Sequence, residues 1–216
     1  MITTQQLQQL IGPGNVTILD IGCNDGEHTQ MFLNLFPNAL LSCFEPDPRA
    51  VQRFKARVTD SRAQLFEMAL GALDSENAVF YQSHGWPSVE EQQKRPGGWD
   101  LSGSIRRPTQ HIALHPWCLF GEVIGVVEKR LDTWAAEHNV DHVDFIWADV
   151  QGAEGDLVAG GRHVLAQTRY FYVEYSDHGL YQGQPTLAQL CATLGSQFEL
   201  MQVWSDDVLF RNKECA

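Results

Sequence analysis

The segment from Val16 to Thr29, VTILDIGCNDGEHT, constrains the fold of this chain more than any other stretch. It opens with an apolar run that ends at Asp20, and such a run is typical of a strand buried on both faces of a parallel sheet. A turn that contains Gly22 and Gly26 follows, and a helix-like stretch begins at Glu27. Strand, glycine turn and helix in this order bring backbone N–H groups and a helix N-terminus against a ligand.

The rest of the chain continues this alternation of apolar strands and amphipathic helices. Further strands are expected over residues 39–44, 64–68, 78–82, 122–129, 143–148 and 169–174. Helices are expected over residues 4–11, 27–36, 49–58, 131–138, 154–166 and 185–194, the last with Pro185 in its first turn. Two final runs, 198–204 and 208–211, have the pattern of an antiparallel hairpin. We therefore expect an α/β fold with a mostly parallel sheet, in a single domain over residues 1–216.

Residues 78–121 interrupt the alternation, and most of this insertion is irregular and rich in Gly, Pro and Trp. A long irregular insertion in a compact domain is typical of a lid or a binding loop. Three tryptophans argue against disorder, and they either stack on a substrate ring or fill a small core of their own. They are Trp86, Trp99 and Trp117.

The same insertion carries four basic residues, Lys94, Arg95, Arg106 and Arg107. In a chain with a formal net charge of −12, such a group could receive an acidic substrate. The alternative is that these side chains are simply solvated. We favour solvation for Lys94 and Arg95, and both interpretations stay open for Arg106 and Arg107.

The net charge also bears on the possible partners. A charge of −12 opposes binding to nucleic acid and to anionic membranes, so we expect neither. The five cysteines include no CxxC pair, and free thiols in a reducing compartment are the plain interpretation. The N-terminus has no basic and apolar leader, and no segment reaches the roughly 18 apolar residues of a membrane span. We expect a cytoplasmic protein whose oligomeric state the sequence does not indicate.

The glycine positions of the opening turn limit the type of ligand. A dinucleotide-binding fingerprint needs glycine where this chain has Asn24 and Glu27, and no Gly-Lys-Ser/Thr of a phosphate-binding loop follows. The remaining pattern, a strand-end acid followed by Gly22 and Gly26, suits a ligand that joins a nucleoside to an amino acid. Glu45 ends the second strand, where a carboxylate can accept hydrogen bonds from both ribose hydroxyls.

Six motifs resemble, in order, those of the FkbM-type S-adenosylmethionine-dependent methyltransferases: DIGCNDGEHT, FEPDP, MALG, RLDTW, VDFIWADVQGAE and YVEYS. The resemblance spans about residues 18–176, and ADVQGAE is its most specific part. The chain departs from the family's usual pattern at Gln151, where glutamate is usual, and at Cys23, where alanine is usual. The resemblance implies a doubly wound, seven-stranded, Rossmann-like sheet with a reversed final hairpin. It also implies methyl transfer from S-adenosylmethionine, usually to a hydroxyl.

The resemblance further implies which residues line the methyl donor. Met68 and Ala69 would lie near the adenine, and Ser104 would approach the site from the insertion. The full set expected to bind the cofactor is Asp20, Gly22, Cys23, Asn24, Gly26, Thr29, Glu45, Pro46, Met68, Ala69, Ser104 and Asp149.

Carboxylates at strand ends are the candidates for catalysis. Ligands of open α/β sheets lie at the carboxyl ends of the strands, where Asp149 and Glu174 fall, and His178 follows shortly after. A hydroxyl acceptor benefits from a general base, which we assign to Asp149, with Glu174 and His178 as orienting groups or alternatives. The competing interpretations are a helix N-cap for Asp149 and a plain loop residue for His178. A divalent cation among these side chains and Glu154 is a minor alternative, because spacing alone does not support it.

The sequence thus predicts an enzyme that methylates a hydroxyl on a small molecule or a sugar-containing natural product. Two alternatives stay open. One is a nucleoside-binding module that has lost catalysis and acts through a protein partner, and the other is an N-methyltransferase, whose amine acceptor needs little help from a base. Convergence of Asp149, Glu174 and His178 on one place would favour an active enzyme.

Overall fold

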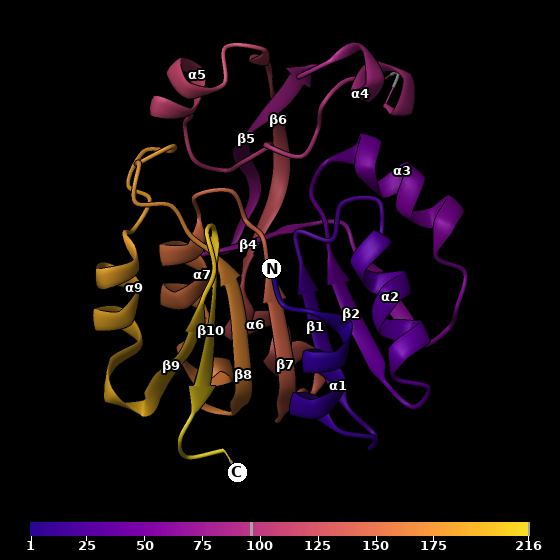
Figure 1. Cartoon of the computed structure of the whole chain (residues 1–216), viewed down its shortest axis with the longest axis vertical. Coiled ribbons are helices and arrows are strands. Elements are labelled where there is room, and N and C mark those ends of the chain that lie inside the picture. The colour runs from indigo at the N-terminus through magenta and orange to yellow at the C-terminus, as the bar shows by residue number, and fades with distance from the viewer. Residues whose placement is uncertain (96, 216) are drawn as a thin grey trace.

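The computed structural model describes residues 1–95 and 97–215, and its centre is a seven-stranded sheet (Figure 1). The strands are β1 (Thr17–Ile21), β2 (Leu40–Phe44), β3 (Ala63–Phe66), β7 (Val143–Ala148), β8 (Thr168–Glu174), β9 (Phe198–Val203) and β10 (Asp207–Asn212). They lie in the order β3-β2-β1-β7-β8-β10-β9, and every neighbouring pair is parallel except the two that β10 makes. The expected mostly parallel sheet with a reversed C-terminal hairpin is confirmed.

Helices cover both faces of this sheet, because its central strands are apolar on both sides. One face carries α1 (Thr4–Ile11), α2 (Glu27–Leu35) and α3 (Pro48–Arg57). The other carries α6 (Leu131–His138), α7 (Glu154–Gly160), α8 (Arg162–Ala166) and α9 (Leu187–Leu194). Successive residues of β1 show the division, since Ile18 packs with the first group of helices and Leu19 with the second.

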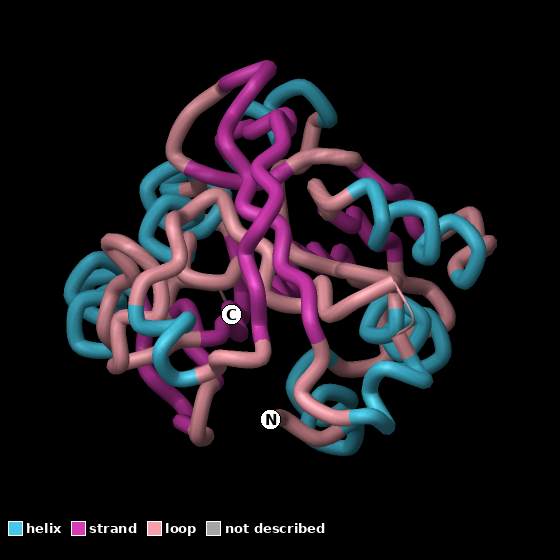
Figure 2. The backbone as a smooth tube through the Cα atoms, turned by 90° about the horizontal axis from the view of Figure 1, so that it is seen from above, coloured by secondary structure: helices cyan, strands magenta, loops and turns pink. Residues whose placement is uncertain are grey.

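A second, three-stranded sheet lies beyond the carboxyl ends of the parallel strands, at the top of Figure 1. Its strands are β4 (Ala69–Gly71), β6 (Cys118–Arg130) and β5 (Ser75–Gly85), in that order. Between β5 and β6 the chain forms the short helices α4 (Val89–Lys94) and α5 (Gln110–Leu114), with a loop over residues 97–105. Seen from above, the long β5–β6 pair crosses over the main sheet (Figure 2).

The insertion is more regular than the sequence predicted. The strands expected over 78–82 and 122–129 are parts of β5 and β6, which continue to Gly85 and begin at Cys118. The two strands pair with each other in antiparallel register and stay outside the main sheet. Cross-strand pairing over this length stabilises strand structure that the local sequence did not indicate.

Two of the element boundaries that differ from the expectation have a clear physical cause. Asp20 lies inside β1 rather than after it, because pairing with β2 and β7 continues past it. Pro185 precedes α9 instead of lying in its first turn, and Thr186 is the N-cap. The interruption expected at Gly160 and Gly161 is present, since it separates α7 from α8.

Two negative findings concern the described part of the chain. None of its helices has both the length and the apolar character needed to cross a membrane. Each of the five cysteines is a free thiol, and three of them, Cys23, Cys43 and Cys118, are buried.

Candidate functional site

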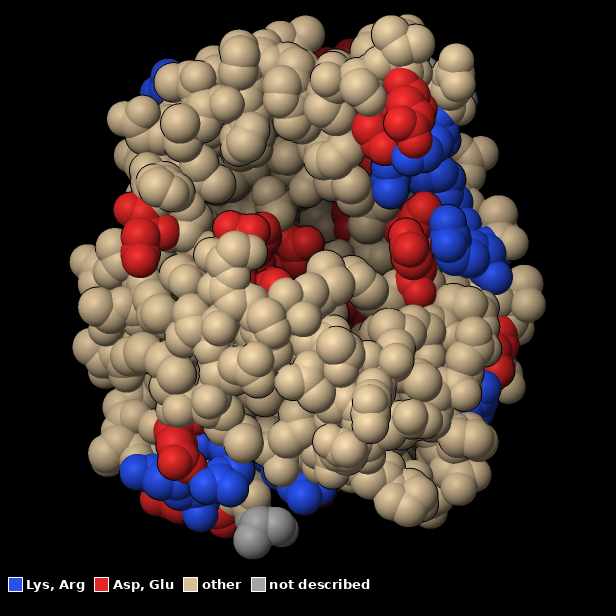
Figure 3. Space-filling model, viewed as in Figure 1, with Lys and Arg blue, Asp and Glu red and all other residues tan. Residues whose placement is uncertain are grey.

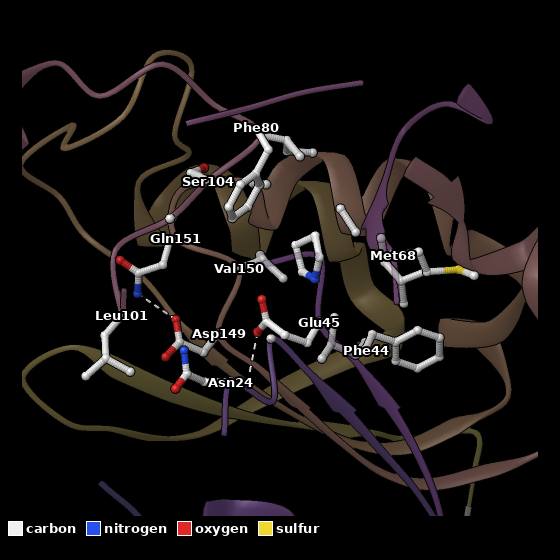
Figure 4. Close-up of a pocket in the computed structure, with 18 of the residues that line it drawn as sticks. Asn24, Phe44, Glu45, Met68, Phe80, Leu101, Ser104, Asp149, Val150 and Gln151 are labelled. Carbon is white, nitrogen blue, oxygen red and sulfur yellow. Dashed lines mark hydrogen bonds between the residues drawn. The ribbon is translucent and has the colours of Figure 1, made fainter. Parts of the chain in front are cut away.

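A cavity of about 590 Å³ lies between the carboxyl ends of the main sheet and the loop over residues 97–105 (Figure 4). The lining residues are Ile21, Gly22, Asn24, Phe44, Glu45, Pro46, Met68, Ala69, Leu70, Phe80, Asp100, Leu101, Gly103, Ser104, Ile105, Asp149, Val150, Gln151 and Ala153. They include eight of the twelve residues expected to bind the cofactor, and the other four are Asp20, Cys23, Gly26 and Thr29.

Gly22 lets the turn after β1 pass close to the end of β7. Its φ is +81°, and a Cβ at this position would lie 1.8 Å from the backbone oxygen of Asp149. The N–H groups of Gly22 and Cys23 both donate to the carbonyl of Phe44, at 2.9 and 3.0 Å. The turn is therefore tied to β2 and leaves no room for a side chain at Gly22.

The four expected residues that do not line the cavity support the turn instead. Gly26 precedes α2 with φ +81°, and a Cβ there would lie 2.6 Å from Cγ2 of Val58. Asp20 is fully buried, and its Oδ2 accepts a hydrogen bond of 2.5 Å from the Thr29 hydroxyl. Burial raises the pKa of Asp20 to about 6. Asp20 thus helps to hold α2 on β1, and the structure does not bring it to the cavity.

Glu45 is held by the backbone through both of its oxygens. Its Oε2 accepts from the N–H of Asn24 at 2.9 Å, and its Oε1 accepts from the N–H of Asp47 at 2.7 Å. Burial raises the pKa of this carboxyl to about 8. Because each carboxylate oxygen has two acceptor positions, Glu45 can still accept two hydrogen bonds from a ligand. A diol such as that of ribose matches these positions.

The wall beside Glu45 is mostly apolar. Met68 contributes from the segment that joins β3 to β4, Ala69 and Leu70 contribute from β4, and Phe80 contributes from β5. Ser104 is buried on the insertion side, and its Oγ accepts from the N–H of Arg106 at 2.9 Å. An apolar surface with a few placed polar groups suits a flat heterocycle such as adenine.

The charge of the cavity is one-sided. Its acidic lining residues are Glu45, Asp100 and Asp149, and no lysine, arginine or histidine of the described residues lines it. The space-filling view shows acidic side chains around a hollow on this face (Figure 3). S-adenosylmethionine carries a sulfonium and an ammonium group against one carboxylate, so its net positive charge suits an acidic cavity. The residues present therefore fit this cofactor.

A pair of carboxylates adjoins the cavity where β7 and β8 end. The Nε2 amide of Gln151 donates to Oδ1 of Asp149 and to Oε2 of Glu174, each at 2.6 Å, and Figure 4 draws the first of these bonds. The Tyr181 hydroxyl lies 2.8 Å from the carbonyl of Ser102 and 3.1 Å from Oε1 of Gln151, and it can donate to either. Asp149 and Glu174, both expected as catalytic residues, are thus joined by one amide.

Burial and mutual repulsion change the acidity of this group. Burial, and then the charge of Asp149, hold the pKa of Glu174 well above its usual value. Glu154 is buried in the first turn of α7, and its Oε1 accepts from the N–H of Gly152 at 2.8 Å. Burial raises the pKa of Glu154 to about 7. This end of the cavity therefore contains two acids whose raised pKa favours the protonated form.

His178 does not join the group. It is exposed on the loop after β8, and its backbone N–H donates to Oγ of Ser176 at 3.2 Å. Asp149 is not a helix N-cap, because Ala153 occupies that position in α7. Within residues 1–95 and 97–215, no three His, Cys, Asp or Glu side chains are arranged to hold a metal ion.

Two residues of the site escaped the sequence analysis. Asp100 is buried and lines the cavity, and it pairs with Arg53 of α3. Its place just before the expected Ser104 was a usable signal. Tyr181 had no such signal, because it meets Gln151 from a position 30 residues away in the chain.

The tryptophans of the insertion mostly contact one another and the backbone. The rings of Trp99 and Trp117 lie edge to face at 5.1 Å, and Nε1 of Trp86 donates to the carbonyl of Arg95 at 2.7 Å. None of the three lines the cavity as the structure describes it. This arrangement favours a small core over a stacking platform.

Three of the four basic residues of the insertion pair with acidic side chains. Arg95, expected to be solvated, is partly buried and lies 3.6 Å from the cavity-lining Asp100. Lys94 is exposed and pairs with Glu90 and Glu91 at 2.9 Å. Arg106, left open by the sequence, forms a two-bond ion pair with Asp156 of α7. That pair connects the insertion to the main sheet's helices, and it leaves Arg106 less available to a substrate.

Comparison with known proteins gives one family. Residues 20–202 match the family model described as "Methyltransferase FkbM domain". The 2-O-methyltransferase NoeI of Sinorhizobium fredii (strain NBRC 101917 / NGR234) is 42% identical over 217 residues, which cover 96% of this chain and 84% of that protein.

Two solved structures share the fold. The methyltransferase FkbM from Methylobacillus flagellatus KT has a TM-score of 0.53 at 15% identity, over 91% of this chain and 43% of the longer one. The fibrillarin of Aeropyrum pernix, solved with natively bound S-adenosyl-L-methionine, has a TM-score of 0.50 at 15% identity, over 97% of this chain and 72% of its own. At these identities the likeness concerns the fold alone.

Proposed function

Because this chain belongs to the FkbM family of S-adenosylmethionine-dependent methyltransferases, we propose that it methylates a hydroxyl of a small molecule such as a sugar-containing natural product. The observation that carries this choice is the Asp149–Glu174 pair beside the cavity. A carboxylate at that place can accept the proton of a hydroxyl, which a neutral amine acceptor does not require. The 42% identical relative is named a 2-O-methyltransferase, which also supports an oxygen acceptor.

The β1–β2 side of the cavity is the proposed donor site. Glu45 would accept hydrogen bonds from the ribose hydroxyls, since its two bonds to backbone N–H groups aim it into the cavity. Met68 and Ala69 would contact the adenine. Gly22 and Asn24 would lie against the amino-acid part of the donor, because both line the cavity at the turn after β1.

The β7–β8 side is the proposed acceptor site. Asp149 lines the cavity and is the proposed base, and Glu174 acts through the Gln151 amide to position it. His178 has no part in this assignment, because no described hydrogen bond joins its side chain to either carboxylate. The Tyr181 hydroxyl, next to the same amide, would help to hold the turn.

The test is methyl transfer from labelled S-adenosylmethionine to matched acceptors that carry a hydroxyl or an amine on the same carbon, such as a pyranose and the corresponding amino sugar. We expect the label on oxygen, and we expect transfer to slow in Asp149→Asn. Transfer to the amine alone would make the enzyme an N-methyltransferase. Tight cofactor binding without transfer to any acceptor would favour the binding module.

We also infer a single domain, a reducing compartment such as the cytoplasm, and a small-molecule partner in preference to nucleic acid. The single domain is supported by the cavity, because both sheets contribute residues to its lining. The five free thiols support the second inference. The net charge of −12 supports the third.

A further inference from the structure

Gln151 places its amide between two acids in spite of an unfavourable backbone conformation. Its φ is +50°, in the left-handed region that residues with a side chain rarely adopt, and Gly152 next to it has φ +92°. A Cβ on Gly152 would lie 2.5 Å from Cβ of Tyr181, so that side chain packs directly on the turn. Strained backbone of this kind concentrates at functional sites. The turn is built to hold one amide at one point.

The amide binds both carboxylates without fixing how many protons they share. Each of its two hydrogens serves a different acid, and both N···O distances are 2.6 Å. An amide neither gains nor loses a proton in this pH range. Asp149 and Glu174 are therefore tied in place while their proton count stays free to change. The glutamate that is usual for the family at position 151 would instead add a third acid.

The groups that face this pair are almost all acidic. They are Glu154 from α7, Asp207 from β10, Asp20 from β1 and the Tyr181 phenol from the loop before α9. No lysine or arginine of the described residues is ion-paired with Asp149 or Glu174. Burial and the charge of Asp149 raise the pKa of Glu174, so this environment favours the protonated form of that carboxyl. A positive charge in the adjoining cavity would favour loss of that proton.

We propose that Asp149 and Glu174, held by the Gln151 amide, form one proton-exchanging pair that releases a proton when the positively charged methyl donor binds and takes one from the acceptor hydroxyl during transfer. Asp149 lines the cavity, and Glu174 is coupled to it through the amide. This inference rests on the proposed function and goes beyond it, because the base becomes free to accept a proton only when the donor is present.

The charges of the site balance over one turnover. The acceptor oxygen bonds to the methyl carbon, the carbon–sulfur bond breaks with its electron pair left on a now neutral sulfur, and the hydroxyl proton moves to a carboxyl oxygen of Asp149. The pair thus gains one proton when the site loses one sulfonium charge. A constant net charge avoids leaving an uncompensated charge among buried acids, which is costly. The pair releases its proton to solvent when the next donor molecule binds.

Calorimetry measures this proton and needs no acceptor. S-adenosylmethionine and S-adenosylhomocysteine are titrated into the protein near neutral pH, in buffers of different ionisation enthalpy, to give the protons released per ligand bound. The two ligands share their adenosine and amino-acid groups, so protons exchanged by Glu45 or by the ligand amine cancel in the difference. We expect S-adenosylmethionine to release more, by a large fraction of one proton. Equal release would overturn the proposal and leave the methyltransferase function standing.

The same titrations on two variants and a matched control test whether the released proton comes from the Asp149–Glu174 pair. In Glu174→Gln the difference between the ligands should fall toward zero, because the pair loses its second titratable group. In Gln151→Glu the difference should grow, and the pH dependence of S-adenosylmethionine binding should move to higher pH. Gln182→Glu makes the same exchange on an exposed side chain next to Tyr181 and should change neither quantity.

The outcomes separate the inference from the function. An unchanged difference in Glu174→Gln, or an equal change in Gln182→Glu, would contradict the proposal. If a variant does not fold, the difference in proton release between the two ligands in the wild-type protein is sufficient to test the proposal. Failure of both ligands to bind would remove the donor site and this inference together, whereas normal proton release without methyl transfer would contradict only the proposed function.

Discussion

On the β1–β2 side of the cavity Glu45 is held by two backbone N–H groups, whereas on the β7–β8 side Asp149 and Glu174 are held by one side-chain amide. Backbone donors are placed by the strands and turns themselves, so side-chain substitutions nearby disturb them little. The amide of Gln151 is lost or replaced by an acid in a single substitution. The first arrangement suits a group that recognises the same part of a ligand in every turnover. The second suits groups whose charge changes during the reaction.

The largest difference between the two sides should be in turnover. Asp149→Asn keeps the shape of the side chain and removes the proton acceptor, so kcat should fall by about 10²- to 10⁴-fold. Glu45→Ala should keep most of its kcat at saturating cofactor. Steady-state methyl transfer to an identified hydroxyl acceptor measures both. Full turnover by Asp149→Asn would place the base elsewhere and break the comparison.

The second largest effect should be on stability, through the turn after β1 that packs against the end of β7. Gly22→Ala should lower the free energy of unfolding by about 3 kcal/mol, because a Cβ would overlap the Asp149 carbonyl in addition to the strain of a positive φ. Gly179→Ala is the control, since Gly179 also has a positive φ, +60°, and nothing lies within 4 Å of its Cβ position. That variant should lose only about 1 kcal/mol. Urea denaturation measures the two values, and equal losses would show that packing against β7 is unimportant.

Cofactor affinity should depend on the β1–β2 side. Glu45→Ala removes an acceptor of two ligand hydrogen bonds, so Kd should rise by about 10- to 100-fold. The rise should be similar for S-adenosylmethionine and S-adenosylhomocysteine, because both contain the ribose. Glu67→Ala, at an exposed carboxylate paired with Lys55, serves as the control and should leave Kd unchanged. A loss confined to one of the two ligands would contradict the assignment of Glu45 to the ribose.

The smallest effect is on the pH dependence of stability without ligand. The pKa of Glu154 is raised from 4.5 to about 7, so its stabilising contribution is complete below pH 4.5 and is lost as the pH rises through 7. The corresponding window for Glu45 extends to about 8. In each window one group lowers the unfolding free energy by at most about 1.4 kcal/mol per pH unit. Denaturation of Glu154→Gln and Glu45→Gln at several pH values should give flatter profiles, and unchanged slopes would mean that both carboxyls are already ionised.

Much of the fold could be predicted from the sequence, because long buried strands and capped helices carry local signals. The mostly parallel sheet, the reversed hairpin and the break near Gly160 follow from such signals, whereas the order of the strands was known only from the structure. The extent of β5 and β6 does not, since their stability comes from pairing with each other. The limits of β1 and α9 differ by a residue or two, where tertiary pairing and capping decide.

The site residues also divide into those that the sequence predicted correctly and those that it did not. Gly22, Asn24, Glu45 and Asp149 stand at strand ends and line the cavity as expected. Asp20 and Thr29 belong to the same motif, yet they do not line the cavity. Side chains on a strand alternate between faces, so Asp20 points toward α2 and accepts a hydrogen bond from the Thr29 hydroxyl. His178 was grouped with Glu174 by its closeness in sequence, but the loop carries it to the surface.

The sequence by itself determined the parallel sheet, the methyl-donor motif and the acids at the strand ends, because each rests on local periodicity or on a motif within a few residues. Only the tertiary structure decided that the cavity has no basic residue among its described lining, that Tyr181 reaches the site, and that Gln151 bridges Asp149 and Glu174. These features join side chains from separate strands and loops. Their charge and burial exist only once those segments are packed together, and no local pattern in the chain encodes them.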